Sequence, residues 1–236
     1  MKGRTVDVDI NPVQVIEHLA RVPFFGYGEI RKGPFALYAD IVYADLGLSG
    51  SGIHTATAGT AGASLGMNFQ QFIAEAGGMY ELARWDSGGS LKDPQAAKSF
   101  TTVDALAGFR YWNQQLDLNF DLASTADTGG LIVSGNRAIA RSGTIEWTDP
   151  LIGLRLRHQL EPGKELILRG DIGGFGAGSQ FSWNLLAACN YAVTKTTSLY
   201  IGYRALDVDY RQGQGKTFYE FDVIQHGPVT GLTVKF

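Results

Sequence analysis

Residues 34–48 read PFALYADIVYADLGL, and this stretch places an apolar side chain at every second position. Leu37, Ala39, Ile41 and Tyr43 therefore share one face of an extended strand, while the opposite face contains the carboxylate of Asp40. Successive side chains of a β-strand point to opposite faces, so a period of two predicts a strand with one apolar face and one face that bears charge.

The same alternation recurs along most of the chain. In NFQQFIAEAGGMYEL it sets Phe72 and Tyr80 against Glu75, and in TVDALAGFRYW it sets Phe109 against Arg110. The period of two predicts an all-β chain rather than a helical one. The predicted strands cover residues 22–32, 35–48, 68–84, 100–122, 146–160, 164–176, 180–193, 197–211 and 217–236.

The residue types on the charged face favour an enclosed interior over a wetted surface. A soluble sheet favours flexible Lys and Glu on its polar side, whereas here Arg and carboxylates are mixed with Gly, Tyr and Asn. The planar guanidinium of Arg satisfies several acceptors at once, which suits a crowded, ion-paired space. The apolar face places aromatics near the expected strand ends, as in the girdles of membrane barrels. These aromatics are Tyr43, Tyr80, Tyr111, Trp183, Tyr191 and Tyr203.

We therefore expect one domain, residues 1–236, that forms a closed antiparallel transmembrane β-barrel of about ten strands. Barrels of this kind have an even number of strands, so GRTVDVDI at residues 3–10 is expected to supply the tenth. A tight hairpin at 113–115 would change the number to eight or twelve. A short helix is expected at residues 11–21, where Asn11 caps and Val15, Ile16 and Leu19 form an apolar stripe.

Connections of two lengths are expected. RKGP at 31–34, EPGK at 161–164 and TKTT at 194–197 predict tight turns on one rim. Longer polar loops are expected on the other rim, at 49–67 and 123–146, and the long connection at 85–98 does not conform to this plan.

Bulges are the expected cause of three changes in the apolar pattern. The apolar set changes face after Tyr111 and after Tyr203, and Phe221 is out of step with Leu232. A bulge inserts one residue and produces such a change, and Gly227–Pro228 is a natural place for the last.

Composition excludes several functions. A net charge of -3 and no cluster of Lys or Arg argue against nucleic-acid binding. The lone cysteine, Cys189, cannot form a disulfide within the chain. No stretch approaches the ~18–20 uninterrupted apolar residues of a membrane helix. The start, MKGRTVDVDINP, lacks the apolar core of a signal peptide, so for an exported protein we expect that such a peptide has been removed.

The segment TGLTVKF at 230–236 resembles the β-signal by which the assembly machinery recognises bacterial outer-membrane barrels. Its matching positions are Thr230, Gly231, Leu232, Val234 and Phe236. GDIGGFGAGS, GYRALDVDY and HGPVTGLTVKF are similar to segments of small opacity-protein-like or uncharacterised outer-membrane β-barrel proteins of Gram-negative bacteria. The resemblance covers 145–236 and, more loosely, 24–48. It departs at the start, where the relatives have a signal peptide and more chain before the helix.

The resemblance implies a location in the bacterial outer membrane. It implies contact with outer-membrane lipid and lipopolysaccharide, and with the barrel-assembly machinery during biogenesis. Members of the family include passive pores, structural anchors and adhesive surface proteins, so no cofactor and no oligomeric state follow from it.

The candidate site is the set of charged residues expected to line the lumen: Asp40, Glu75, Asp104, Arg110, Arg155, Arg157, Arg169, Asp171 and Arg204. In a structural interpretation these residues neutralise one another, because an unpaired buried charge is costly. In a functional interpretation some of them line a narrow polar route for small solutes. A barrel of ten strands is expected to be mostly filled by its side chains.

Two other functions stay open at this point. Some outer-membrane barrels are lipid A deacylases with Ser, His and an acid on the outer surface, but His18, His54, His158 and His226 are scattered and have no metal-binding spacing. We expect no catalytic residues and no enzyme. GDIGGFGAG lies in an expected strand and opens no helix, so it does not predict a phosphate loop. A soluble lipocalin-like barrel is the other alternative, and it would place its apolar face inside around a ligand.

Overall fold

The computed structural model describes residues 19–56, 59–87, 99–127, 132–214 and 218–234. In chain order the strands are β1 (Leu19–Lys32), β2 (Phe35–Ala56), β3 (Gly59–Ser87), β4 (Ser99–Asp127), β5 (Ile132–Glu161), β6 (Lys164–Gly173), β7 (Phe181–Ala192), β8 (Thr197–Gln212) and β9 (Tyr219–Val234). No helix in these residues has the length and apolar composition needed to cross a bilayer.

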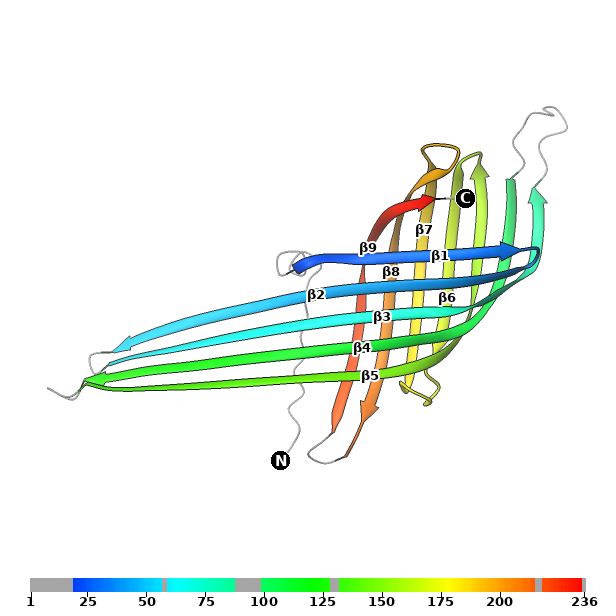
Figure 1. The fold of residues 1–236 in the computed structure, drawn as a ribbon. Coiled ribbons are helices and arrows are strands. Elements are labelled where there is room, and N and C mark those ends of the chain that lie inside the picture. The colour runs from blue at the N-terminus through cyan, green and yellow to red at the C-terminus, as the bar shows by residue number, and fades with distance from the viewer. Residues whose placement is uncertain (1–18, 57–58, 88–98, 128–131, 215–217, 235–236) are drawn as a thin grey trace. The chain divides into compact units, whose positions relative to one another are not determined.

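The strands form one sheet in which each strand pairs with its neighbours in the sequence, in the order β1-β2-β3-β4-β5-β6-β7-β8-β9. The pairs from β5 to β9 are antiparallel, and β6, β7 and β8 lie side by side (Figure 1). The prediction of an all-β chain is confirmed, and every predicted strand from residue 22 onward has a counterpart. The expected strand at 3–10 and residues 11–18 of the expected helix lie outside the described residues, while residues 19–21 belong to β1.

The tight turns are placed as predicted, but the two long loops are not. Gly33–Pro34 and Pro162–Gly163 connect their strands directly. The polar stretches 49–67 and 123–146, which we expected to be loops, are instead mostly strand, because β2 continues to Ala56 and β5 begins at Ile132. Backbone pairing with a neighbouring strand does not require an apolar face, and these stretches are rich in Thr, Ser and Ala. The predicted strand 164–176 is too long by three residues, since β6 ends at Gly173, and only residues 170–173 of the run 170–178 are strand.

The bulges expected in the last strands are absent. β8 pairs residue by residue with both β7 and β9, and Tyr203 lies opposite Pro228 without a shift in register. The apolar residues after Tyr203, among them Leu206 and Val208, keep the phase of Arg204 and lie buried beside it. The inner face thus changes from charged to apolar along β8, whereas our prediction moved the apolar set to the outer face. A hairpin at 113–115 is excluded because β4 runs through it.

The contacts of the chain divide it into two compact units. The first comprises residues 1–24, 42–72 and 113–146, and the second comprises 25–41, 73–112 and 147–236. In the first unit Asp45, Gln71 and Gln114 are buried. The second unit contains all the predicted lumen residues and is the subject of the following sections.

Within the second unit the sheet curls, because residues of strands that are far apart in the sheet order touch one another. Arg204 of β8 bonds to Asp40 of β2, and the ring of Phe25 in β1 stacks on Tyr200 of β8 with ring centroids 6.3 Å apart. The inner face of this curl contains a small apolar core of Ala36, Tyr38, Met79, Leu106 and Leu151.

Two glycines allow β3 and β4 to approach closely inside this unit. A Cβ on Gly77 would lie 2.4 Å from the carbonyl oxygen of Ala107, and one on Gly108 would lie 2.4 Å from that of Ala76. A Cβ on Gly77 would also lie 2.8 Å from the ring of Tyr38. Glycine in a strand marks such close approach of backbones, so these positions shape the curl beside the charged inner face.

Candidate functional site: an ion-paired inner face

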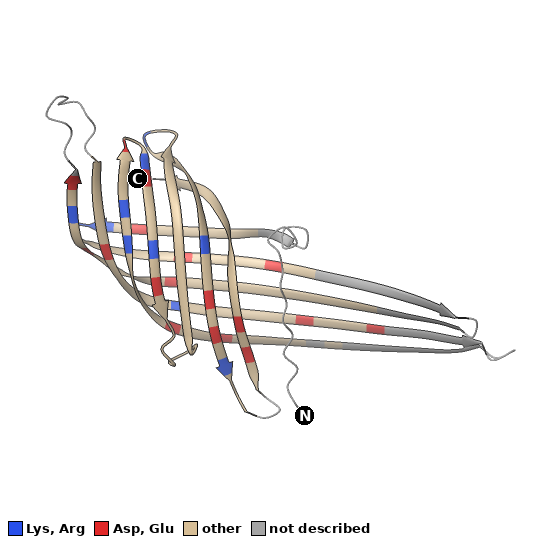
Figure 2. Ribbon diagram, turned by 180° about the vertical axis from the view of Figure 1, so that it is seen from behind, with Lys and Arg blue, Asp and Glu red and all other residues tan. Residues whose placement is uncertain are grey.

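A central network of ion pairs occupies the middle of the inner face. It joins Asp40, Glu75, Arg110, Arg169, Asp171 and Arg204, which come from β2, β3, β4, β6 and β8. Basic and acidic residues accordingly lie on neighbouring strands (Figure 2).

Arg110 is the best-buried cation of the central network, with no exposed surface. Its Nε and Nη2 donate to Glu75 at 2.9 and 2.7 Å, and its Nη2 also donates to Asp171 at 2.5 Å. Arg169 donates to the other oxygens of the same two carboxylates, Glu75 at 2.6 Å and Asp171 at 3.0 Å. The two carboxylates therefore each bridge two guanidinium groups, which offsets the cost of removing these charges from water.

Arg204 connects β8 to this centre. Its Nη1 donates to Asp40 at 3.1 Å and its Nε donates to the side-chain oxygen of Asn184 at 2.8 Å. The amide nitrogen of Asn184 donates in turn to Asp171 at 2.8 Å, so a neutral residue closes the ring of contacts.

A second network lies nearer to the Gly33–Pro34 and Pro162–Gly163 turns, and we call it the turn-side network. It consists of Glu29, Arg31, Glu81, Asp104, Arg155, Arg157 and Glu165. Asp104 is fully buried and accepts from Arg31 at 2.9 Å and from Arg155 at 2.8 Å. Among the described residues no ion pair joins the two networks, so the ion pairs of the inner face form two separate layers.

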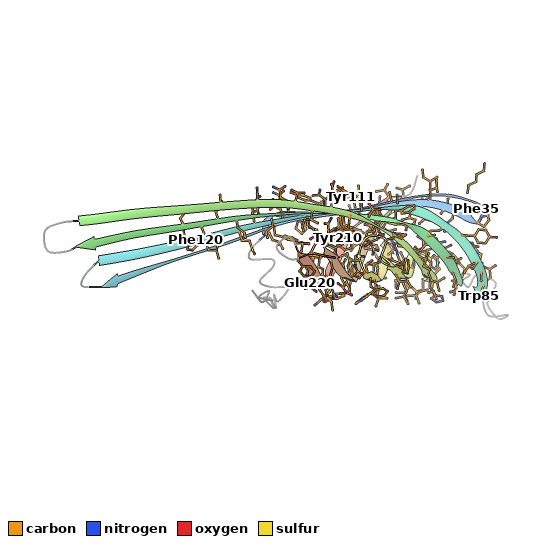
Figure 3. The ribbon with its side chains drawn as sticks, turned by 90° about the horizontal axis from the view of Figure 1, so that it is seen from below. Phe35, Trp85, Tyr111, Phe120, Tyr210 and Glu220 are labelled. Atoms are coloured by element: carbon orange, nitrogen blue, oxygen red, sulfur yellow. The ribbon has the colours of Figure 1, made fainter. Side chains whose placement is uncertain are left out.

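The part of the inner face next to the β6–β7 and β8–β9 connections is aromatic. The rings of Trp112 and Trp147 stack with centroids 5.4 Å apart, and Trp147 stacks on Tyr210 at 3.9 Å. Tyr210 lies inside the curl of the sheet, whereas Phe35 lies at its outer edge (Figure 3). Flat rings fill space with few rotatable bonds, so this layer closes off one end of the ion-paired interior.

A fully buried carboxylate, Asp149, attaches the connection at 174–180 to this aromatic layer. It accepts from Trp112 Nε1 at 3.0 Å, from the Ser179 amide at 2.6 Å, and from the hydroxyls of Ser179 at 2.7 Å and Ser182 at 3.4 Å. Its partners are all neutral donors. Asp149 therefore has the contacts of a structural anchor for the connection rather than those of a member of an ion pair.

The outer face of the same strands is apolar and exposed. Leu37, Phe109, Leu154, Leu185 and Ile201 expose 69, 63, 54, 54 and 56% of their surface. Their sequence neighbours, such as Arg110 and Arg155, point to the inner face and are buried. This is the reverse of the arrangement in a soluble sheet, where the exposed face is polar and the buried face apolar.

All nine predicted lumen residues lie on the inner face of the second unit and belong to one or the other network. Sequence reasoning did not include Glu29, Arg31, Glu81 and Asn184 among the site residues, although each takes part. Glu29 and Arg31 alternate in phase with the strand before the first tight turn, and that signal could have identified them. Asp149 has the phase of Arg155 and Arg157 in its strand, so the same signal could have identified it.

His158 of β5 and His226 of β9 lie on the outer face, away from the networks. His158 Nδ1 is 2.7 Å from the hydroxyl of Thr101, and His226 Nδ1 is 2.5 Å from that of Tyr203. Ser182 is buried against Asp149. In the part of the chain that the structure describes, no group of His, Cys, Asp and Glu has a metal-binding arrangement. Of the β-signal residues, Leu232 and Val234 are exposed in β9, and Phe236 lies outside the described residues.

A scan against models of known protein families matched none of them, and searches of curated proteins and of solved structures likewise found no match.

Proposed function

We propose that this chain is an integral β-barrel protein of the bacterial outer membrane, in which a mostly filled, ion-paired lumen serves a structural or surface role. One observation carries the proposal: apolar side chains cover the outer face while Arg, Asp and Glu are buried on the inner face. Exposed apolar area on this scale is unfavourable in water and favourable against acyl chains. β6 and β7, with 10 and 12 residues, have the length that a tilted strand needs to cross a bilayer core.

Closure of the barrel is part of this proposal. The contacts of Phe25 with Tyr200 and of Glu29 with Arg155 bring β1 toward β8 and β5 and support a closed form.

A soluble lipocalin-like barrel is less well supported. Such a barrel surrounds its ligand with apolar side chains, whereas the inner face here is occupied by paired charges. A deacylase is less well supported too, because His158 and His226 bond to Thr101 and Tyr203 rather than to a serine and an acid.

Substitution of Leu185 by Arg tests the membrane assignment. Leu185 is near the middle of β7 and half exposed, so in a soluble protein Leu185→Arg would change the free energy of unfolding by less than ~0.5 kcal/mol. In a bilayer the same change costs ~2–4 kcal/mol. Urea unfolding of the full chain refolded into phospholipid vesicles measures the difference. Thr196→Arg, in the exposed β7–β8 turn, is the matched control, and equal stability of the two variants would end the proposal.

A further inference from the structure

An open apolar hollow of about 600 Å³ lies on the outer face across β1, β2, β3 and β4. Its floor is made by small residues, Gly78, Ala105 and Ala107, and its walls by large ones, among them Phe35 and Tyr80, whose rings lie 5.0 Å apart. The hollow therefore forms because small residues lie beside large ones on an apolar surface.

The hollow has a charge at one end only. Lys32 lines it beside the Gly33–Pro34 turn, and its side chain is exposed. Its neighbour Arg31 is engaged in the turn-side network, but among the described residues no ion pair involves Lys32. Lys32 therefore places an ammonium group without an ion pair, among the described residues, at the end of the apolar lining.

We propose that this hollow is a binding site for one phospholipid, with an acyl chain along Gly78, Ala105 and Ala107 and the phosphate at Lys32. This inference rests on the proposed membrane location and adds a particular lipid position to it. An apolar cleft loses van der Waals contacts wherever it is left unfilled, and in a bilayer the available filler is an acyl chain. The single ammonium at the rim is the complement of a phosphate on the same molecule.

The position of Lys32 also orients the lipid. Tyr80 and Phe35 lie on the turn side of the hollow, where a girdle of aromatic residues is expected at a membrane interface. The headgroup is therefore placed at the rim that bears the short turns, and the acyl chain runs toward Ala105 and Ala107 in the bilayer core.

Native mass spectrometry of the full chain in detergent micelles doped with palmitoyl-oleoyl phosphatidylglycerol tests the site. We expect one retained lipid on the unmodified chain and loss of that lipid in Gly78→Leu, which fills the hollow. A Cβ on Gly78 meets no atom closer than 3.9 Å, so the fold tolerates the change. Gly170→Leu is the matched control, since Gly170 of β6 also has its nearest atom at 3.9 Å, and it should keep the lipid.

The phosphate contact is tested separately with Lys32→Gln. We expect the affinity for the phospholipid to fall about fivefold, or ~1 kcal/mol, while Lys195→Gln in the β7–β8 turn leaves it unchanged. Equal lipid retention in Gly78→Leu and Gly170→Leu would overturn the site. So would a dimer in the spectra that Gly78→Leu alone dissociates, because the hollow would then be covered by a second copy. Either result leaves the Leu185→Arg test of membrane insertion intact, so failure of the site is distinguishable from failure of the proposed function.

Discussion

At the scale of single residues, the charged groups on the inner face depend on one another. Glu75 accepts hydrogen bonds from Arg110 and Arg169, and Asp171 accepts from the same two arginines and from Asn184. Removing one partner of such a buried pair leaves the other charge uncompensated, and this costs more than the pair itself contributes to stability.

Arg169→Leu should therefore lower the free energy of unfolding by ~3–5 kcal/mol, because Glu75 and Asp171 each lose a cation in a buried setting. Arg211→Leu is the control. Its guanidinium also forms two ion pairs, with Asp209 and Glu220, but it is about half exposed, and such pairs contribute ~0–1 kcal/mol. Denaturant unfolding of both variants in phospholipid vesicles measures the losses, and similar values would contradict the buried network.

At the scale of elements, close contact between strands and the anchoring of connections shape the curled sheet. Gly77 and Gly108 bring β3 and β4 together at the point where Tyr38 packs inside. In the connection at 174–180, Phe175 has a φ of 52°, which is rare for a residue other than glycine, and Asp149 accepts a hydrogen bond from the nearby Ser179.

Gly77→Ala should destabilise the protein by ~1–3 kcal/mol, because the added methyl would overlap the carbonyl oxygen of Ala107 unless the two strands separate. Gly78→Ala adds the same methyl one residue later, on the outer face, with no atom closer than 3.9 Å. We expect it to be tolerated. Thermal or urea unfolding of the pair compares the two faces of one strand, and equal stability would show that the close approach does not constrain the fold.

Asp149→Asn should loosen the connection at 174–180, because an amide NH2 would replace one of the two oxygens that accept from Trp112, Ser179 and Ser182. A buried donor left without an acceptor costs ~1–3 kcal/mol. Hydrogen exchange followed by mass spectrometry should show faster exchange of the Ser179 amide. Asp222→Asn, the same change at an exposed position of β9, should leave that rate unchanged, and slow exchange in both variants would refute the anchoring role.

At the scale of the whole molecule, the function depends on whether the interior conducts. The two ion networks and the aromatic stack occupy successive levels of the inner face. An inner face filled in this way leaves little room for a continuous aqueous path, as in narrow barrels whose side chains fill the lumen.

We expect the full chain to be silent in planar lipid bilayers, without discrete openings. Membrane insertion is verified independently by protection of the strands from protease after the full chain has been refolded into phospholipid vesicles. Discrete openings would instead favour a passive pore. If their ion selectivity changed in Asp104→Asn, the route would pass the turn-side network, because Asp104 is the fully buried acceptor at the centre of that network.

The sequence by itself determined the class of fold and the face on which the nine predicted inner charges lie. Strict alternation fixes the direction of every second side chain, so Asp40, Arg110 and Arg169 could be assigned to one face without coordinates. The short turns were predictable for a similar reason, since Gly and Pro act locally.

Only the tertiary structure decided which charges pair and where the strands end. Arg204 meets Asp40 across 164 residues of sequence, and no local pattern specifies such a contact. The polar stretch around 49–67 became strand because a neighbouring strand satisfies its backbone, and β8 kept its register past Tyr203 because the inner face accepts Leu206 and Val208 among its aromatic residues. Alternation describes one strand at a time, whereas pairing, register and burial arise between strands, and this is why they could not be predicted from the alternation alone.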